Sequence, residues 1–197
     1  MPAHPTLSSL RAAAARCRGC DLYEHATQTV FGEGRAHAPL MFVGEQPGDR
    51  EDREGHPFVG PAGSLLRRAM DAAGVDPRDA YITNAVKHFK FVERGKRRIH
   101  TKPKVTEVRA CLPWLEAEIA LVRPHVVVAL GATAAQALLG PAFRLTAHRG
   151  ELLAARLAPR VLATVHPSSI LRARDDETRH REFAAFVQDL RALTARV

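Results

Sequence analysis

The chain has 197 residues, 46% of them hydrophobic, which is enough for one domain with its own core and too few for two. No run of about 18 or more apolar residues occurs, and residues 1–10 lack the layout of a secretory signal, so the sequence indicates neither a membrane span nor export and predicts a cytoplasmic protein. Lysine and arginine total 29 against 21 acidic residues, and the formal net charge of +8 favours a polyanionic partner without specifying a fold.

Hydrophobic periodicity predicts alternating strands and helices, because short β-branched runs that end in glycine, proline or polar turns alternate with segments of helical spacing. In chain order, the predicted elements are a short helix beginning in Arg11–Arg16, a strand at Leu40–Gly44, a helix at Ala62–Ala73, a strand at Ala80–Ala85, a helix at Val105–Val122, a strand at His125–Leu130, a helix at Ala132–Leu139, a strand at Val161–Val165 and a final helix with Phe183, Phe186, Val187, Leu190 and Leu193 on one face. The segment Phe143–Leu153 fits either a further strand pair or an irregular excursion. The pattern predicts a single α/β domain over residues 1–197, with three layers in which helices cover both faces of a central, mainly parallel four-stranded sheet.

Polar residues follow each of the four predicted strands, where open α/β sheets bind their ligands. They are Gly44-Glu45-Gln46, Thr83-Asn84, Gly131-Ala132-Thr133 and His166-Pro167-Ser168-Ser169. The amide of Asn84 offers both a donor and acceptors for a base edge, and His166 could donate a hydrogen bond to a developing oxyanion. Such residues also populate turns for backbone reasons, so each is ambiguous alone.

A basic segment from Arg94 to Lys104 combines six cationic residues with Gly95 and Pro103, which favours a loop over a helix. Its composition is typical of a loop that contacts phosphates. A mobile, solvated loop is the alternative.

Three cysteines in a protein expected in the cytoplasm argue against a disulfide framework. Cys17 and Cys20 have the C-x-x-C spacing that lets two thiolates share one metal centre, and Cys111 is the third. Structural zinc, an iron-sulfur cluster and a redox-active cysteine pair all fit this spacing.

Three segments resemble the signatures of the iron-sulfur uracil-DNA glycosylases, in the same order along the chain. They are GEQPGDREDREGHPFVGPAGSLL at residues 44–66, TNAVKH at residues 83–88 and HPSSILR at residues 166–172. Together with the cysteines, the resemblance extends from Cys17 to Arg172 and covers most of the chain.

The resemblance implies a uracil pocket in which Phe58 stacks on the base, Asn84 binds its Watson–Crick edge and His166 stabilises the departing uracil. Gly44, Gln46 and Asp49 complete the implied pocket. The partner is then uracil-containing DNA, single-stranded by preference, because a base within a duplex must first be flipped out. The protein is expected to act as a monomer associated with the nucleoid. The residues implied in phosphate binding are Lys96, Arg97, Arg98, Ser168, Ser169 and Arg172.

The same resemblance favours a [4Fe-4S] cluster over zinc. Cys17, Cys20 and Cys111 are three of its implied ligands. His88 is the implied fourth ligand, because it stands where the family's TNxVKC signature has a cysteine. The cluster would tie the N-terminal segment to the rest of the chain.

Two departures from the hydrolytic members resemble the covalently trapping UdgX branch: Gln46, where many members have alanine, and the segment KRRIH at residues 96–100. In that branch the loop histidine, here His100, attacks the sugar C1′ after uracil leaves. A neutral imidazole is a competent nucleophile near pH 7, and Glu45 could stabilise the sugar cation, accept a proton or orient a water. Without this context, His100 would be one more polar residue in a basic loop.

Three hypotheses follow from the sequence. The first is a uracil-DNA glycosylase that ends covalently linked to DNA through His100. The second is a turnover glycosylase that releases abasic DNA, and the third is a non-enzymatic single-stranded DNA-binding module. KRRIH favours the first over the second, and the pocket residues disfavour the third.

Overall fold

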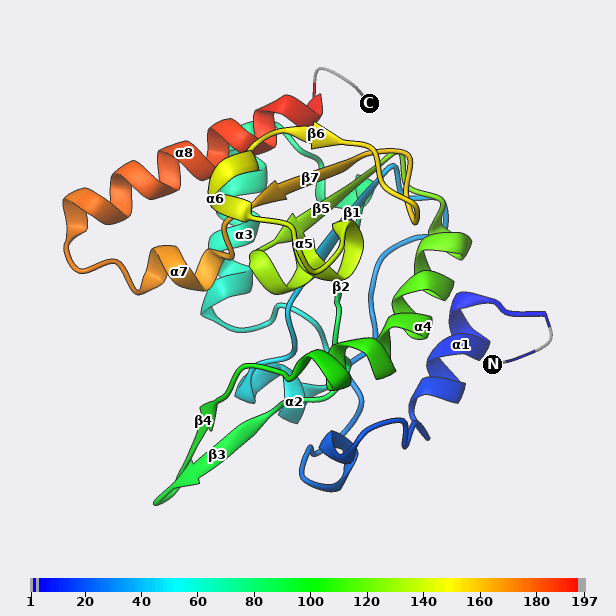
Figure 1. The fold of residues 1–197 in the computed structure, drawn as a ribbon. Helices are drawn as coiled ribbons and strands as arrows, with labels where there is room; N and C mark the ends of the chain where they lie inside the picture. The colour runs from blue at the N-terminus through cyan, green and yellow to red at the C-terminus, as the bar shows by residue number, and fades with distance from the viewer. Residues whose placement is uncertain (1, 3, 195–197) are drawn as a thin grey trace.

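The protein is described by a computed structural model that covers residue 2 and residues 4–194. A five-stranded sheet in the order β2-β1-β5-β7-β6 lies at its centre (Figure 1). Its strands are β1 (Leu40–Gly44), β2 (Ala80–Asn84), β5 (Val126–Leu130), β6 (Leu152–Leu153) and β7 (Val161–Thr164). The first four in spatial order are mutually parallel, and β6 pairs antiparallel with β7 at one edge.

Helices cover both faces of this sheet and complete three layers (Figure 1). They are α1 (Leu7–Ala14), α2 (Asp49–Glu54), α3 (Pro61–Ala73), α4 (Val105–Val122), α5 (Ala132–Leu139), α6 (Leu145–His148), α7 (Pro167–Leu171) and α8 (Asp176–Thr194), with short 3-10 turns at Asp21–Glu24 and Pro77–Asp79. The predicted α/β class with a mainly parallel central sheet is confirmed. The predicted strand number was short by one, because β6 has only two residues and lies in the segment whose pattern was ambiguous.

The two faces of the sheet bury separate apolar cores. Alternate residues of β1 point to opposite sides: Phe42 packs in the core under α3 and α8, and Met41 packs in the core under α4 and α5. All five residues of β1 and of β5 are buried, since helices exclude water from both sides. Continuous apolar runs are therefore typical of these strands.

The segment predicted as a basic loop instead forms a hairpin of β3 (Phe91–Arg94) and β4 (Arg97–His100), which projects from the body of the protein (Figure 1). Gly95 has a positive φ of 59° at its turn, a conformation that glycine adopts without strain. Glycine here joins two strands and does not mark an irregular loop. The expectation of a loop was wrong for residues 94–100.

The N-terminal helix α1 packs against α4 through Leu10 and Ala14. It begins earlier than predicted, because the hydroxyl of Thr6 accepts a hydrogen bond from the backbone N–H of Ser9 and caps the helix. Among the described residues, no helix has both the length and the apolar character needed to cross a membrane.

Candidate active site

The carboxyl ends of the parallel strands bring the predicted site residues to one edge of the sheet. Glu45 follows β1, Asn84 ends β2, Thr133 lies in the first turn of α5 after β5, and His166 follows β7. Sequence-distant groups therefore meet at the place where open α/β sheets form ligand sites.

One part of this site is a closely packed group formed by Gly44, Phe58 and Asn84. A Cβ atom on Gly44 would lie 2.3 Å from Asn84 Oδ1 and 2.7 Å from the Phe58 ring, so a larger residue does not fit. Asn84 is 2% exposed, and its Oδ1 has no hydrogen-bond partner among the described residues. A buried carbonyl oxygen without a partner is costly unless a ligand supplies the donor.

Phe58 is held in an unusual backbone conformation, with φ at 55°. A bulky residue in this region is strained, and such strain concentrates at functional sites. The backbone of Phe58 lies so close to Gly63 that a Cβ atom there would be 1.7 Å from its carbonyl oxygen, and Arg67 donates a hydrogen bond to the same oxygen over 2.9 Å. Helix α3 thus fixes the ring beside Asn84.

His166 lies on the other side of Phe58, with the two ring centroids 5.8 Å apart. The backbone N–H of Ser168 donates to His166 Nδ1 over 3.1 Å. Because this nitrogen accepts, the proton of the neutral ring is on Nε2. Burial, with Arg172 and His100 adding to it, lowers the pKa of His166 to about 4, so the ring is a neutral donor near pH 7.

Glu45 and His100 form the second part of the site, with His100 Nε2 lying 3.4 Å from Glu45 Oε1. Thr133 donates a hydrogen bond to the other carboxylate oxygen and so fixes the carboxylate plane. Burial lowers the pKa of His100, Glu45 opposes this by raising it, and Arg172 lowers it further. The imidazole is half exposed and neutral near pH 7.

The side chain of Gln46 holds the base of the hairpin that carries His100. Its Nε2 donates to the carbonyl oxygens of Lys90 (3.2 Å) and Thr101 (3.1 Å), and its Oε1 accepts from the backbone N–H of Lys90 over 3.1 Å. Both ends of the hairpin are thereby tied to the residue that follows Glu45. The expectation that Gln46 lines the uracil pocket is not tested by these contacts and stays a prediction.

Arg98 holds the middle of the hairpin against α2. Its guanidinium donates to Asp49 Oδ1 (2.5 Å) and to Asp52 Oδ2 (2.7 Å), and it lies 4.9 Å from the centroid of the Phe91 ring. The Arg98 side chain is only 14% exposed. Arg98 and Asp49 thus bind one another, and the expectations that Arg98 contacts a DNA phosphate and that Asp49 lines the uracil pocket stay predictions.

Strand alternation separates the hairpin residues into two faces. Arg98 and His100 lie on the face that packs against the protein, and Arg97 and Ile99 lie on the other. Arg97 and Lys96 are exposed and form no ion pair within the part of the chain that the structure describes. These two cations are therefore accessible to a phosphate, as is the exposed Arg94 on β3.

The predicted phosphate-binding residues that follow His166 also fall into two groups, those that contact His166 and one that is exposed. The Ser168 hydroxyl lies 2.8 Å from His166 Nδ1, and the Ser169 hydroxyl donates to the His166 carbonyl oxygen over 2.7 Å. Both hydroxyls thus support His166. Arg172 is exposed and lies close enough to influence both histidines of the site.

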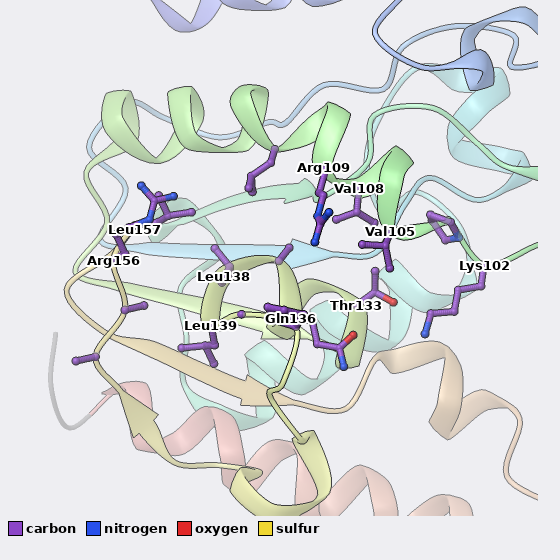
Figure 2. A pocket seen from close by; sticks show the side chains of 17 residues that line it. Lys102, Val105, Val108, Arg109, Thr133, Gln136, Leu138, Leu139, Arg156 and Leu157 are labelled. Carbon is purple, nitrogen blue, oxygen red and sulfur yellow. The ribbon is translucent and has the colours of Figure 1, made fainter.

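A cavity of about 490 Å³ lies beside the site, between α4 and α5 (Figure 2). Its walls are mainly apolar, with Lys102 and Arg109 among the polar residues, and it shares Thr133 with the Glu45 side of the site. Phe58, Asn84 and His166 do not line it. The residues around Asn84 are thus separate from this cavity.

The four expected cluster ligands lie at the N-terminal side of the protein, but residues 2 and 4–194 contain no group of three His, Cys, Asp or Glu side chains that could hold a metal ion. Cys20 and Cys111 pack with Leu22 and Val86, and burial raises the pKa of both thiols, that of Cys111 to about 11. Cys17 accepts a hydrogen bond from the Trp114 indole over 3.2 Å. The thiols are gathered in one region without forming a closed metal site.

His88 has one ring nitrogen without a partner. Thr29 donates its hydroxyl proton to the Ala14 carbonyl oxygen, so its oxygen, 2.9 Å from His88 Nε2, accepts from that nitrogen. The lone pair is then on Nδ1, which is buried and unpartnered among the described residues. Burial lowers the pKa of His88 and keeps the ring neutral. His88 and Cys17 also line a cavity of about 520 Å³.

One residue important to the geometry was missed from the sequence. Thr133 was found because it follows a predicted strand, although its contact with Glu45 was not predicted. Asp52 lies in the charged run DREDRE, yet it is fully buried, accepts from the Thr27 backbone N–H over 3.0 Å and binds Arg98. Nothing in that composition shows which acid is buried.

The fold and site define an α/β protein with a buried, unpartnered amide oxygen and two neutral histidines at the carboxyl edge of its sheet. The family model for the uracil DNA glycosylase superfamily matches residues 31–191. A type-4 uracil-DNA glycosylase of Thermotoga maritima is 38% identical over 165 residues, which are 83% of this chain and 82% of that protein. A type-4 uracil-DNA glycosylase of Pyrobaculum aerophilum is 36% identical over 173 residues (84% and 85%), and a type-5 uracil-DNA glycosylase of the same organism is 32% identical over 183 residues (84% and 77%). The chain belongs to the uracil DNA glycosylase superfamily.

The contacts of Arg98 predict that it stabilises the hairpin locally. In Arg98→Met, we expect amide hydrogen exchange across residues 91–100 to accelerate by about tenfold or more, because local opening no longer breaks the two ion pairs. Arg97→Met is the matched control, since Arg97 lies on the exposed face. Equal protection of the hairpin in both variants would show that Arg98 does not hold it.

Proposed function

We propose that this protein excises uracil from DNA and then becomes covalently linked to the sugar through His100. The observation that carries the first part is the buried, unpartnered Oδ1 of Asn84 beside Phe58 and the neutral donor His166. The names of the type-4 relatives support the same substrate. The observation that carries the second part is the approach of His100 to Glu45.

Base selection follows from the amide of Asn84. Uracil presents an N3–H donor beside its O4 acceptor, and the free Oδ1 of Asn84 accepts from the first while the amide nitrogen donates to the second. Cytosine presents the opposite pattern, an acceptor at N3 and a donor at N4, and so leaves the buried oxygen unpaired. Phe58 provides the face on which the ring stacks.

Bond cleavage places negative charge on the departing uracil, because the electron pair of the C1′–N1 bond leaves with the base. His166 donates from Nε2 to this growing charge, and Ser168 keeps the ring in the tautomer that can donate. Because its pKa is low, His166 is a neutral imidazole near neutral pH, so it donates a hydrogen bond without carrying a positive charge. The sugar is left as an oxocarbenium-like cation.

His100 then forms the new bond to C1′. Its unprotonated nitrogen supplies the electron pair, the ring becomes an imidazolium, and the proton on the other nitrogen is released. Glu45, fixed by Thr133, stabilises the cationic sugar and the imidazolium in turn. In a turnover glycosylase, which is the second candidate function, Glu45 would instead orient a water. The proximity of His100 to Glu45 favours the covalent outcome.

Single-stranded DNA is the proposed preferred substrate, since its target base reaches Phe58 and Asn84 without the cost of unpairing. Lys96, Arg97 and Arg172 are the exposed cations proposed to bind flanking phosphates. Such contacts make binding salt-sensitive.

We also propose a [4Fe-4S] cluster held by Cys17, Cys20, Cys111 and His88. The lone pair on His88 Nδ1 fits this role, because the atom is buried and has no other partner among the described residues. Each ligand of such a cluster binds a different iron atom, so the four need not converge as they would on one zinc ion. When bound, the cluster supplies a covalent tie between the N-terminal segment, the end of β2 and α4.

The covalent link is tested by His100→Ala. We expect the parent to form a complex with uracil-containing single-stranded DNA that survives denaturing electrophoresis, and His100→Ala to form less than about a tenth as much, because the nucleophile is absent. His148→Ala is the matched control, since His148 also pairs with a glutamate, Glu151, but lies away from the site. Equal complex formation by His100→Ala would show that another residue is the nucleophile.

The pH dependence follows from the low pKa of His100. Only the neutral imidazole attacks; burial and Arg172 lower the pKa of His100, while Glu45 raises it. We therefore expect the rate of complex formation to fall as the pH is lowered, with its half-maximal point below the ordinary histidine value of about 6.5.

Arg172→Gln provides the control for this profile. Removing its positive charge raises the pKa of His100, so the acid limb is expected to move to higher pH. A parent rate that has fallen to half at or above about pH 6.5 would contradict a His100 of lowered pKa.

The cluster is tested by visible absorption of protein purified without oxygen. We expect the broad charge-transfer absorption of an iron-sulfur protein in the parent and its loss or weakening in His88→Ala, because one ligand is removed. His25→Ala is the control. A colourless parent that contains zinc would contradict the assignment.

A further inference from the structure

A buried ion pair lies next to Asn84, between Lys87, three residues after the end of β2, and Glu118 on α4. Their side chains are 1% and 0% exposed. Neither residue contributes to the steps described above. Moving two charges from water into a protein interior is costly, and a pair of well-packed apolar residues is often at least as stable. Stability alone is therefore a weak reason for this pair.

The ammonium group of Lys87 has three N–H donors and three acceptors around it. It donates to Thr83 Oγ1 (2.7 Å), to the Asn84 carbonyl oxygen (2.7 Å) and to Glu118 Oε2. The group is thus fully satisfied, and one of its acceptors is the main chain of the residue proposed to bind uracil.

The carboxylate of Glu118, which pairs with that ammonium group, also accepts hydrogen bonds from several neighbouring elements. Its Oε1 accepts from the Gly32 backbone N–H (3.1 Å), the Tyr81 hydroxyl (2.9 Å) and the Thr83 hydroxyl (3.0 Å). Helix α4, strand β2 and the segment around Gly32 are therefore joined at one side chain. The backbone from Tyr81 to Lys87, which includes Asn84, is therefore restrained at several points.

This restraint matters because base recognition depends on the direction in which the Asn84 amide points. Its Oδ1 accepts no hydrogen bond from the described residues, so no contact to that oxygen holds the amide in place. A small rotation of the Asn84 backbone would turn the free oxygen away from a bound base. Networks of buried, fully satisfied polar groups restrict such rotation.

We propose that Lys87 and Glu118 are positioning residues for base recognition, which hold the main chain of Asn84 so that its free oxygen meets the N3–H of uracil. The inference rests on the proposed function of Asn84 and adds the residues that orient it. Neither side chain touches the substrate.

The test is the double variant Lys87→Met/Glu118→Gln, which removes both charges and keeps the side-chain volumes similar. Removing only one partner would leave an unpaired buried charge and endanger folding. With protein in excess over uracil-containing DNA, the rate of uracil release saturates with protein concentration. We expect the half-saturating concentration to rise by about tenfold or more, equivalent to the loss of one charged hydrogen bond. Binding to the same oligonucleotide with thymine in place of uracil should not change.

A purely structural role would change a different quantity. It would lower the fraction of active protein, seen in the amplitude of uracil release, and leave the half-saturating concentration unchanged; that result would overturn the proposal. The control is Arg156→Met/Glu116→Gln, which removes both members of an exposed ion pair (2.7 Å) whose glutamate lies on α4, the helix that carries Glu118, and is expected to leave the half-saturating concentration at the parent value.

Thr83→Val is the second variant, in case the double variant does not fold. It is similar in size and removes the hydroxyl that links Lys87 to Glu118. We expect a change in the same direction, and an unchanged half-saturating concentration in this variant would also overturn the proposal. If the parent itself releases no uracil, the proposed function is wrong. If the parent releases uracil and the variants have the same half-saturating concentration, only the positioning role of Lys87 and Glu118 is wrong.

Discussion

The attachment of the β3–β4 hairpin to the edge of the central sheet is the constraint on which the proposed chemistry depends. His100 is carried on a two-stranded projection, and an isolated hairpin of this size is marginally stable in water. Gln46 ties its two ends to the residue after Glu45, and Arg98 ties its middle to Asp49 and Asp52. These contacts place an imidazole 3.4 Å from a carboxylate that the sheet itself positions.

We propose different tasks for the two histidines of the site, and their surroundings suit them to these tasks. His166 is fixed by Ser168 with its proton on Nε2, as the proposed donor to a leaving group requires. His100 is half exposed at the end of a strand, as the proposed attack on a sugar requires. Both have a lowered pKa, and burial is the largest cause in each case. Near neutral pH the site therefore holds two neutral imidazoles, the proposed donor and the proposed nucleophile.

Sequence patterns were sufficient for the core of the fold and insufficient for its edges. The strands β1 and β5 were predicted because both faces are covered and their residues are uniformly apolar. The hairpin was missed because its strands are short, charged and mostly exposed, so they lack the apolar alternation of a half-buried strand. The strand β6 was missed because two residues carry no periodicity.

For the site, too, some residues could be found from the sequence and the roles of others could not. Residues that directly follow a strand, such as Glu45 and His166, were found because parallel strands end at a common edge. The role of Arg98 depends on which face of β4 it occupies, and that face is defined only when residues 97–100 are known to be a strand. Composition marks Arg97 and Arg98 as equivalent, whereas the structure buries one and exposes the other.

Peptide mapping of the protein–DNA product is the most direct test of a covalent link through His100. The protein would be reacted with uracil-containing single-stranded DNA, digested with nuclease and protease, and analysed by tandem mass spectrometry. We expect a deoxyribose adduct on the His100 imidazole and free uracil in solution. An adduct on another residue, or unmodified protein together with free abasic DNA, would contradict the role assigned to this histidine.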